Sequence, residues 1–286
     1  MRKRLLFLLL GLLLLAACAS PGPEAHPAAE APTEAAPAPA PAPEPVYLAM
    51  AADGEHPQLI AHAGGAVYGY RLTNSLEALE NAYAAGFRYI ELDFVRSSDG
   101  GIVLLHDWES MARRLLGEAG VKRREDFLAA PALGGLTLLD AGGLLRWMEA
   151  HPDCCIVTDI KEEDNAAILR ELRDLAGDAA GRFLPQAYSF EEAAALREEG
   201  WERVILTLYR MQTTPEELGA FLDVCPLWAV TVAEGRITEE LSAAVAGRGC
   251  ALYCHTVNTL DFVDEWRDKG LTGIYTDYFQ PAHWVY

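Results

Sequence analysis

Short apolar runs alternate with helical stretches along most of the chain, and this alternation limits the folds that it can adopt. The runs that we expect to form strands are, in order, IAH, IELD, CCIVTDIK, LPQAYS, RVILTLY, LWAVTV, ALYCHTV and GIYTDY. Stretches with helical spacing of apolar residues, such as TPEELGAFLDV and TEELSAAVAGRG, lie between them. Eight strands joined by helical crossovers are typical of a closed parallel barrel. We therefore predict an α/β protein with the (β/α)8, or TIM-barrel, fold.

The segment after the second run departs from this alternation. Ser98, Asp99, Gly100 and Gly101 are residue types that favour tight turns, and the apolar run IVLLHD follows at once. A parallel connection needs a dozen or more residues, so this run must return antiparallel to the strand before it. We expect a β-hairpin excursion after strand 2, which brings His106 back toward the polar end of that strand.

Two helices have local signals at their ends. Asn74, with Glu77 three residues later, resembles a capping box, and the apolar spacing that follows predicts a helix that ends at Gly86. The spacing from Leu138 to Ala150 predicts an amphipathic helix.

The first 45 residues differ in composition from the rest of the chain. Residues 1–17 combine three basic residues, a leucine-rich core and small residues before Cys18, as in the signal peptide of a bacterial lipoprotein whose first mature residue bears the lipid. The alternative is an ordinary secretory signal with an incidental cysteine. In both cases we expect the protein outside the cytoplasm, and in the first case it is anchored to the cell membrane.

The next segment separates this signal from the globular part. Residues 18–45 are rich in Ala, Pro and Glu and cannot bury enough apolar surface to fold, so they are expected to form a disordered linker. Residues 46–286 have the length of one barrel domain, and we expect a monomer.

The net charge of −19 excludes some partners. A strongly acidic surface argues against binding to nucleic acid and against electrostatic adhesion to anionic lipid. A phosphate-bearing substrate would need a locally reversed field, which a divalent cation and a lysine can provide.

The chain has six cysteines, and the five that remain after Cys18 cannot all pair. Cys250 and Cys254 lie on one predicted strand, about 13 Å apart at the rise of a strand, which is too far for a disulfide. We expect reduced cysteines in the core rather than a disulfide scaffold or a zinc site.

Polar residues end three of the predicted strands. His62 ends the first, Glu91 and Asp93 end the second, and Asp159 and Lys161 end the third. In a barrel of this kind the carboxyl ends of the strands meet at one face, where catalytic groups are found. Three carboxylates there form a hard oxygen site suited to Mg2+ or Ca2+, and the lysine supplies a point charge for a phosphate oxygen.

Two histidines, His62 and His106, flank this predicted metal site and can accept and donate protons. Cleavage of a phosphodiester needs this combination, because cations offset the charge on the non-bridging oxygens while two imidazoles move protons. A serine hydrolase is disfavoured because the chain has no GxSxG motif. A zinc amidohydrolase would need more histidine ligands than these strands offer.

The order of the motifs extends this interpretation. IAHAGG, NSLEAL, IELDF, SSDG, VLLHD, DIK, HTVN and GIYTDY occur in the order and spacing of the glycerophosphodiester phosphodiesterase family, part of the phosphatidylinositol-specific phospholipase C-like superfamily. The chain resembles this family from Leu59 to Phe279. The resemblance implies a (β/α)8 barrel with two catalytic histidines, His62 and His106. It also implies a cyclic phosphate, formed when a neighbouring substrate hydroxyl attacks phosphorus.

The same resemblance implies that the divalent metal is held at the positions of Glu91, Asp93 and Asp159.

Four positions depart from the family pattern. Ala63 stands where the family usually has an arginine that contacts phosphate, and Thr73 stands where its PENT motif has glutamate. Asp159 replaces a usual glutamate, and His255 replaces a tryptophan common at the mouth of the barrel. These departures bear on the identity of the substrate more than on the metal and histidine pattern.

Several residues are candidates for the role of the missing arginine. Arg71 and His255 are possible substrate-binding residues, and Arg210 is a further candidate. Asp277, after the last strand, is expected to cap a loop.

The expected substrate is a small-molecule or phospholipid phosphodiester, and the expected activity is that of a phosphoric diester hydrolase. One alternative is a phospholipase C that cleaves phosphatidylinositol. Another is a surface lipoprotein that binds phosphorylated headgroups without turnover, which the alanine at position 63 motivates.

Overall fold

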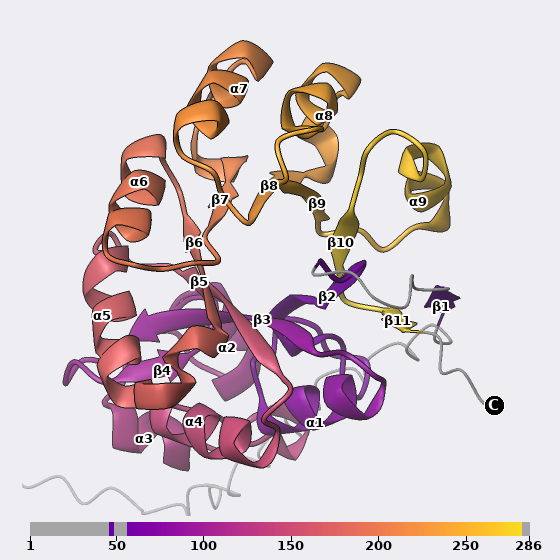
Figure 1. Cartoon of the computed structure of the whole chain (residues 1–286). Coiled ribbons are helices and arrows are strands. Elements are labelled where there is room, and N and C mark those ends of the chain that lie inside the picture. The colour runs from indigo at the N-terminus through magenta and orange to yellow at the C-terminus, as the bar shows by residue number, and fades with distance from the viewer. Residues whose placement is uncertain (1–45, 49–55, 282–286) are drawn as a thin grey trace, which may run out of the picture. The chain divides into compact units, whose positions relative to one another are not determined.

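The computed structural model describes residues 46–48 and 56–281, and these residues form a parallel barrel surrounded by helices (Figure 1). The ring runs through β2 (Leu59–Ala61), β3 (Tyr89–Arg96), β5 (Cys155–Ile160), β6 (Phe183–Ala187), β7 (Ile205–Thr207), β8 (Ala229–Ala233), β9 (Ala251–His255) and β10 (Gly273–Thr276). Neighbouring strands in this ring are parallel, and the pairing of Ala61 with Ile90 and of Ala61 with Thr276 joins β2 to both its neighbours. The predicted TIM barrel is confirmed, and its eight strands are the eight predicted from the sequence.

The hairpin excursion is also confirmed. β4 (Ile102–Leu104) pairs antiparallel with β3, with Leu104 opposite Phe94. Among the strands, β4 pairs only with β3, so it lies outside the ring.

Helices connect and cover the strands. They are α1 (Leu76–Ala84), α2 (Ser110–Leu116), α3 (Arg124–Ala129), α4 (Ala141–Ala150), α5 (Asn165–Ala176), α6 (Phe190–Glu198), α7 (Pro215–Val224), α8 (Glu239–Val245) and α9 (Leu260–Trp266). Short 3-10 segments are η1 (His62–Gly64), η2 (Leu133–Gly135), η3 (Gly177–Arg182), η4 (Leu208–Arg210) and η5 (Glu234–Arg236).

Local side-chain hydrogen bonds fix where several helices begin. Thr214 and Glu217 form a reciprocal capping box at the start of α7, with Pro215 in its first turn. Asp140 caps α4 by accepting a hydrogen bond from the Gly143 amide, so this helix begins after the predicted position, Leu138.

The start of α1 also differs from the prediction. Ser75, rather than Asn74, is the N-cap, and its hydroxyl accepts a hydrogen bond from the amide of Ala78. Glu77 accepts hydrogen bonds from Thr137 instead of completing a capping box. The side chain of Asn74 is therefore available for contacts inside the barrel, which are described below.

Side chains alternate between the two sides of each barrel strand. On β3, Ile90, Leu92 and Phe94 belong to the large apolar core between the barrel and its helices, whereas Glu91 and Asp93 face the other way. A separate apolar cluster in the barrel interior includes Ile60, Val157, Leu184, Ile205, Trp228, Ala229, Ala251, Tyr253 and Tyr275. The interior is thus filled by side chains.

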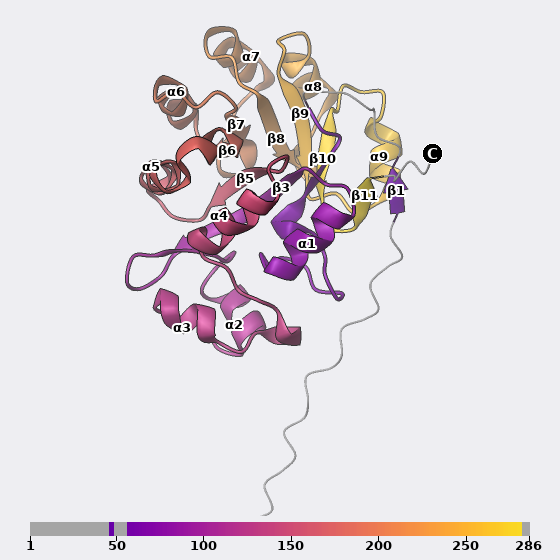
Figure 2. The same ribbon diagram turned by 60° about the horizontal axis from the view of Figure 1, so that its bottom comes forward.

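The connection from β4 to α4 has an apolar cluster of its own. Trp108 packs edge-on against Phe127 of α3, and Met111 and Leu115 of α2 join the same cluster. Figure 2 shows α2 and α3 next to each other, away from the helices that follow the later strands.

The remaining strands form a small sheet apart from the barrel. β1 (Val46–Leu48) pairs in parallel with β11 (Phe279–Pro281), which directly follows the last barrel strand.

The five cysteines among the described residues are free, as predicted.

Residues 1–17 and 18–45, predicted as signal peptide and linker, lie outside the described residues, and so does Cys18. Within residues 46–48 and 56–281, none of the helices has both the length and the apolar character needed to cross a membrane.

Candidate metal and active site

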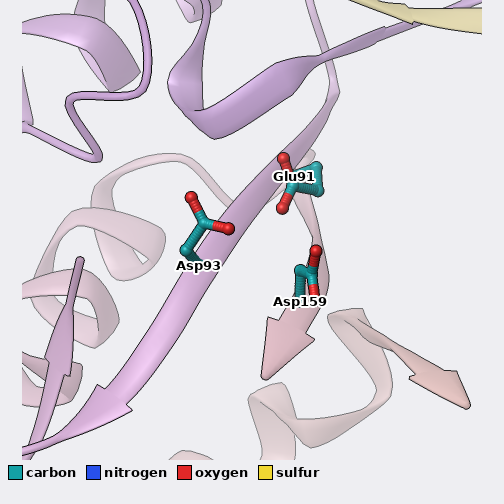
Figure 3. Close-up of side chains that lie close together, drawn as sticks. All are labelled: Glu91, Asp93 and Asp159. Carbon is teal, nitrogen blue, oxygen red and sulfur yellow. The ribbon is translucent and has the colours of Figure 1, made fainter. Parts of the chain in front are cut away.

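Three carboxylates meet in the barrel where β3 and β5 lie side by side. Glu91 and Asp93 project from β3, Asp159 projects from β5, and the register pairs Asp93 with Asp159. One carboxylate oxygen from each residue lies within 4.8 Å of the other two, and all three residues are buried. Figure 3 shows the three side chains facing a common point. The predicted convergence of these acids is therefore seen in the structure.

Glu91 and Asp93 are held by groups from the loop between β2 and α1. Glu91 Oε2 accepts a hydrogen bond of 2.8 Å from the main-chain amide of Ala63. The side-chain amide of Asn74 donates to Asp93 Oδ2 at 2.9 Å, and its oxygen accepts from the Asp93 amide at 2.9 Å. Asn74 has a φ of 51°, a left-handed conformation that asparagine tolerates better than most residues. Sequence reasoning assigned Asn74 to helix capping and missed this contact.

Asp159 and Lys161 form the other side of this group. Lys161 Nζ lies 2.6 Å from Asp159 Oδ2 and 3.0 Å from Asp93 Oδ1, so its ammonium group balances two of the three carboxylates. The Tyr188 hydroxyl donates to Asp159 Oδ1 at 2.6 Å. Burial raises the pKa of Asp159, but the charge of Lys161 and these hydrogen bonds outweigh it and lower that pKa.

The carboxylate of Glu91 lacks such compensation. Burial raises the pKa of Glu91 to about 8, with a further contribution from the negative charge of Asp93. Its Oε1 atom is buried and has no hydrogen-bond partner. A buried oxygen without a partner, beside two further carboxylates, fits a hard divalent cation such as Mg2+ or Ca2+. The three acids could hold a metal ion, as predicted.

His62 lies next to this group, in η1 immediately after β2. Its Nδ1 is 2.9 Å from Asp277 Oδ1, and its Nε2 is 4.0 Å from Glu91 Oε2. Burial lowers the pKa of His62, but the hydrogen bond with Asp277 and the charges of Glu91 and Asp93 outweigh it and raise that pKa to about 9. The chain thus places one predicted histidine against the predicted metal ligands.

Asp277 was expected to cap a loop, and this prediction missed its main contact. Besides His62, its carboxylate contacts Arg71 at 3.4 Å and accepts a hydrogen bond of 2.8 Å from Asn258. The Asn258 side-chain oxygen in turn accepts hydrogen bonds from the Asp277 amide and the Thr276 hydroxyl. These contacts fix the carboxylate that orients the His62 ring. Asp277 is 7% exposed, so water competes little for its carboxylate.

His106 comes two residues after β4, as the hairpin requires. The amide of the preceding Leu105 donates to the Asp93 carbonyl at 3.2 Å, so the backbone here adjoins β3. His106 Nδ1 lies 2.9 Å from Asp107 Oδ2. Asp107 also accepts hydrogen bonds from the Ser110 hydroxyl and from the amides of Ser110 and Met111 at the start of α2. Burial raises the pKa of Asp107, but the hydrogen bonds from the Ser110 hydroxyl and His106, together with those from the two amides, outweigh it and hold that pKa well below the usual range.

The two possible substrate-binding residues lie in different places. Arg71 is half exposed and contacts Asp277, the partner of His62. His255 is partly buried, its Nδ1 lies 2.8 Å from the Thr231 hydroxyl, and its ring meets Tyr209 and Tyr275 edge-on. Burial lowers the pKa of His255 to about 4, with a further contribution from the charge of His62.

His255 also lines a small inner cavity of about 30 Å³ beside the acids. The lining residues are His62, Glu91, Asp159, Gln186, Thr207, Tyr209, His255 and Tyr275. His106 and Arg71 are not among them. His62 and His255 thus reach this cavity, whereas Arg71 and His106 lie outside its lining.

Two comparisons identify the relatives of this arrangement. Residues 62–140 match the model of the glycerophosphoryl diester phosphodiesterase family. This segment contains both predicted catalytic histidines, two of the three clustered acids and the hairpin.

Similar solved structures cover most of the described barrel. A glycerophosphodiester phosphodiesterase from Thermotoga maritima is 18% identical with a TM-score of 0.63, covering 79% of this chain and 96% of that one. A phosphodiesterase from Oleispira antarctica, solved with the product sn-glycerol-3-phosphate, is 16% identical with a TM-score of 0.64, covering 78% and 94%. A glycerophosphoryl diester phosphodiesterase from Parabacteroides distasonis is 18% identical with a TM-score of 0.63, covering 79% and 85%. At these identities the likeness establishes the shared fold.

The family resemblance predicted from the motifs is confirmed by the sequence match, and the barrel agrees with it. The acid/base roles of His62 and His106 and the phosphate contact of Lys161 stay predictions. Residues 62–140 therefore match the glycerophosphoryl diester phosphodiesterase family, and the barrel that surrounds them has the fold of the solved structures named above.

Proposed function

We propose that the protein is a metal-dependent phosphodiesterase that hydrolyses glycerophosphodiesters. The observation that carries this proposal is the buried cluster of Glu91, Asp93 and Asp159 with His62 at its side. Buried carboxylates repel one another unless cations compensate them, and Lys161 contacts only two of the three. A site with this excess of negative charge suits a divalent cation and, through it, a phosphate group.

The cluster supplies the electrostatic part of the reaction. Charge neutralisation at the non-bridging phosphate oxygens is the chemistry that a divalent cation held by Glu91, Asp93 and Asp159 contributes. Lys161 adds a second positive charge at the same face of the barrel. Its three donors can be shared between its carboxylate partners and a phosphate oxygen.

The histidines supply the proton transfers. In both His62 and His106 a carboxylate holds Nδ1, which leaves Nε2 as the nitrogen that can meet the substrate. One imidazole takes the proton from the attacking hydroxyl, and the other gives a proton to the leaving oxygen. The arrangement of two rings that are both fixed at Nδ1 supports this pairing.

A turnover assay tests the proposal. Purified protein with Mg2+ or Ca2+ is expected to release glycerol 3-phosphate or a cyclic glycerophosphate from glycerophosphodiesters, and a chelator is expected to abolish the release. The Glu91→Gln variant removes one carboxylate charge and should lose at least about a hundredfold in kcat. Glu163→Gln is the matched control, because Glu163 is exposed and follows the same strand as Asp159.

Other products would decide against this assignment. Release of diacylglycerol with inositol phosphate from phosphatidylinositol would indicate the phospholipase C activity instead. Binding of headgroups without turnover across a broad panel of phosphodiesters would indicate a non-catalytic lipoprotein.

We further propose that the enzyme is exported and attached to the membrane through Cys18. The sequence of residues 1–18 supports this location, and the proposal concerns only where the barrel acts. Metabolic labelling with a fatty acid should mark the parent chain and leave Cys18→Ser unlabelled. An unlabelled parent chain that still fractionates with the cytoplasm would contradict export.

A further inference from the structure

A second pocket lies at the end of the barrel where the strands begin. It has a volume of about 300 Å³ and is formed by the segments that lead into β6 and β7, together with the last turn of α5. Arg203 in its wall contacts the Tyr89 hydroxyl at 3.4 Å and the Cys155 thiol at 3.5 Å, and these two residues begin β3 and β5. The clustered acids project from later positions on the same two strands. The pocket shares no lining residue with the inner cavity and is separate from the candidate active site.

Two arginines in the wall of this pocket carry positive charge that no carboxylate balances. Arg173 donates from Nη1 to the Glu199 carbonyl at 2.9 Å, and Arg203 donates from Nη2 to the Gly181 carbonyl at 2.6 Å. The contacts that the described residues give these two guanidinium groups are to carbonyls, a hydroxyl, a thiol and an aromatic ring. In a chain with a net charge of −19, two arginines without an acidic partner in one pocket indicate an anionic ligand.

The contacts to carbonyls do not use up the donors of the arginines. A guanidinium group has five N–H donors, and Arg173 gives one of its nitrogens to a carbonyl. The guanidinium carbon of Arg173 lies 3.9 Å from the centroid of the Trp201 ring, and this stacking occupies the face of the group while its donors lie in the plane. The contacts therefore hold the Arg173 guanidinium in place and leave it able to bind an oxyanion.

A buried donor beside the arginines lacks an acceptor. Trp201 lines the pocket and is 4% exposed, and its indole Nε1 has no hydrogen-bond partner among the described residues. An unpaired buried N–H costs about 1–3 kcal/mol, and native proteins seldom leave one without a partner. Because Arg173 lies over the same ring, an anion that Arg173 binds comes close to the edge of the indole.

We propose that this pocket binds a phosphate group through Arg173, Arg203 and the indole N–H of Trp201. A phosphate monoester carries a charge of about −1.5 to −2 at neutral pH, which matches two guanidinium groups better than the single charge of a carboxylate. Glu202 is the only acid in the lining, and it is exposed, so it weakens the attraction without cancelling it. The volume leaves room for a small group esterified to the phosphate. This site does not depend on the proposed function.

The indole N–H signal of Trp201 reports directly on the proposed contact. The chain has six tryptophans, and the Trp201→Phe variant identifies this signal in spectra of the nitrogen-15-labelled, Mg2+-loaded protein, because the variant lacks it. Titration of the parent with inorganic phosphate should move the signal downfield until the site is saturated. Phosphate bound at the metal site does not interfere, since the readout belongs to Trp201.

Charge variants with a matched control test the pocket itself. Arg173→Gln and Arg203→Gln each remove one positive charge and should weaken phosphate binding about tenfold. Arg170→Gln should bind as the parent does, because Arg170 is exposed on the same helix as Arg173 and does not line the pocket. Glu202→Gln should tighten binding about threefold, because it removes a repelling charge at an exposed position. This last variant keeps the test valid where an arginine variant fails to fold.

The choice of anion identifies the class of ligand. Glycerol 3-phosphate that binds more tightly than inorganic phosphate would indicate a phosphate monoester, and the reverse order would indicate free phosphate. Both orders support a phosphate site. Acetate that binds as tightly as either phosphate would overturn the proposal, because a single negative charge would then be enough.

Two further results would also overturn it. A Trp201 signal that neither phosphate moves across the millimolar range would show that the pocket does not bind phosphate. A signal that moves equally in the parent, Arg173→Gln and Arg203→Gln would show that the arginines do not recognise the anion. None of these measurements uses turnover, so the failure of this site and the failure of the proposed function are distinguishable.

Discussion

The two predicted catalytic histidines have the same kind of partner in very different surroundings. His62 is held by Asp277, which lies 215 positions away in the sequence and has a side chain only 3% exposed. His106 is held by Asp107, its neighbour in the chain, with a side chain 31% exposed. In the proposed reaction both pairs leave Nε2 for the substrate, but only the first pair is built by closure of the barrel. We call the buried His62–Asp277 pair the inner pair and the more exposed His106–Asp107 pair the outer pair. The difference in burial predicts that the inner pair tolerates substitution far less than the outer pair.

Removal of the imidazole rings should have the largest effect on kcat, and the loss should be the same for the two pairs. His62→Ala and His106→Ala are each expected to lower kcat by about a thousandfold, because each removes one proton-transfer group. His151→Ala is a suitable control, since His151 stacks on Trp147 at the end of α4. Steady-state kinetics on a glycerophosphodiester measures the effect. A variant that matches the parent would show that its ring takes no part in the reaction.

Removal of the partner charges should separate the pairs. Asp277→Asn is expected to lower kcat by about a hundredfold, because the amide can hold His62 in the wrong tautomer and little water reaches this buried position to compensate. Asp107→Asn should lower kcat only severalfold, because solvent reaches this pair. For both variants KM should change little, since neither aspartate contacts the substrate in this proposal. Equal losses would contradict the assigned difference between inner and outer pairs.

The stability of the fold should also depend more on the inner pair than on the outer pair, although the effects are smaller than those on kcat. Asp277→Ala leaves His62 and Arg71 without their shared partner and is expected to lower the free energy of unfolding by about 3 kcal/mol. Asp107→Ala removes hydrogen bonds to the first turn of α2 and should lower it by about 1 kcal/mol. Urea unfolding curves measure both. Asp107→Ala as the more damaging change would reverse the comparison.

The pH dependence of stability should be the smallest effect, and it should have the same direction for both aspartates. For Asp107 and Asp277 the folded protein has a pKa below the ordinary value of 3.8, so each adds stability that is complete above that value and is lost as the pH falls through the lowered pKa. The stability differences between the parent and Asp107→Asn or Asp277→Asn should therefore be greatest at neutral pH and shrink below about pH 4. Thermal unfolding from pH 7 to pH 3 measures this. A difference that grows toward low pH would contradict the direction of both shifts.

The parts of the site that were predictable from the sequence follow from strand periodicity. Glu91 and Asp93 are two residues apart on a strand and so share a side, and Asp159 ends the strand that pairs with theirs. The hairpin was predictable because the turn before β4 is too short for a parallel crossover. The eight barrel strands were predictable for a different reason, because each is an apolar run bounded by helical segments.

Contacts between residues that follow the first and the last strand of the barrel were not predicted. Asp277 follows β10 as His62 follows β2, and a closed ring makes these two strands neighbours. That relation was a usable signal, but a local interpretation of Asp277 as a loop cap passed over it. Asn74 was missed for a related reason: a helix-capping pattern and a contact to a buried carboxylate look alike in sequence, and only the left-handed backbone of Asn74 separates them.

The parallel pairing of β1 with β11 has a mechanical consequence. The chain that leads into the barrel is joined to the strand that leaves it by a sheet of three residue pairs. Tension applied through the N-terminal side of β1 would therefore load this short sheet first, and the sheet would break before any barrel strand bears force.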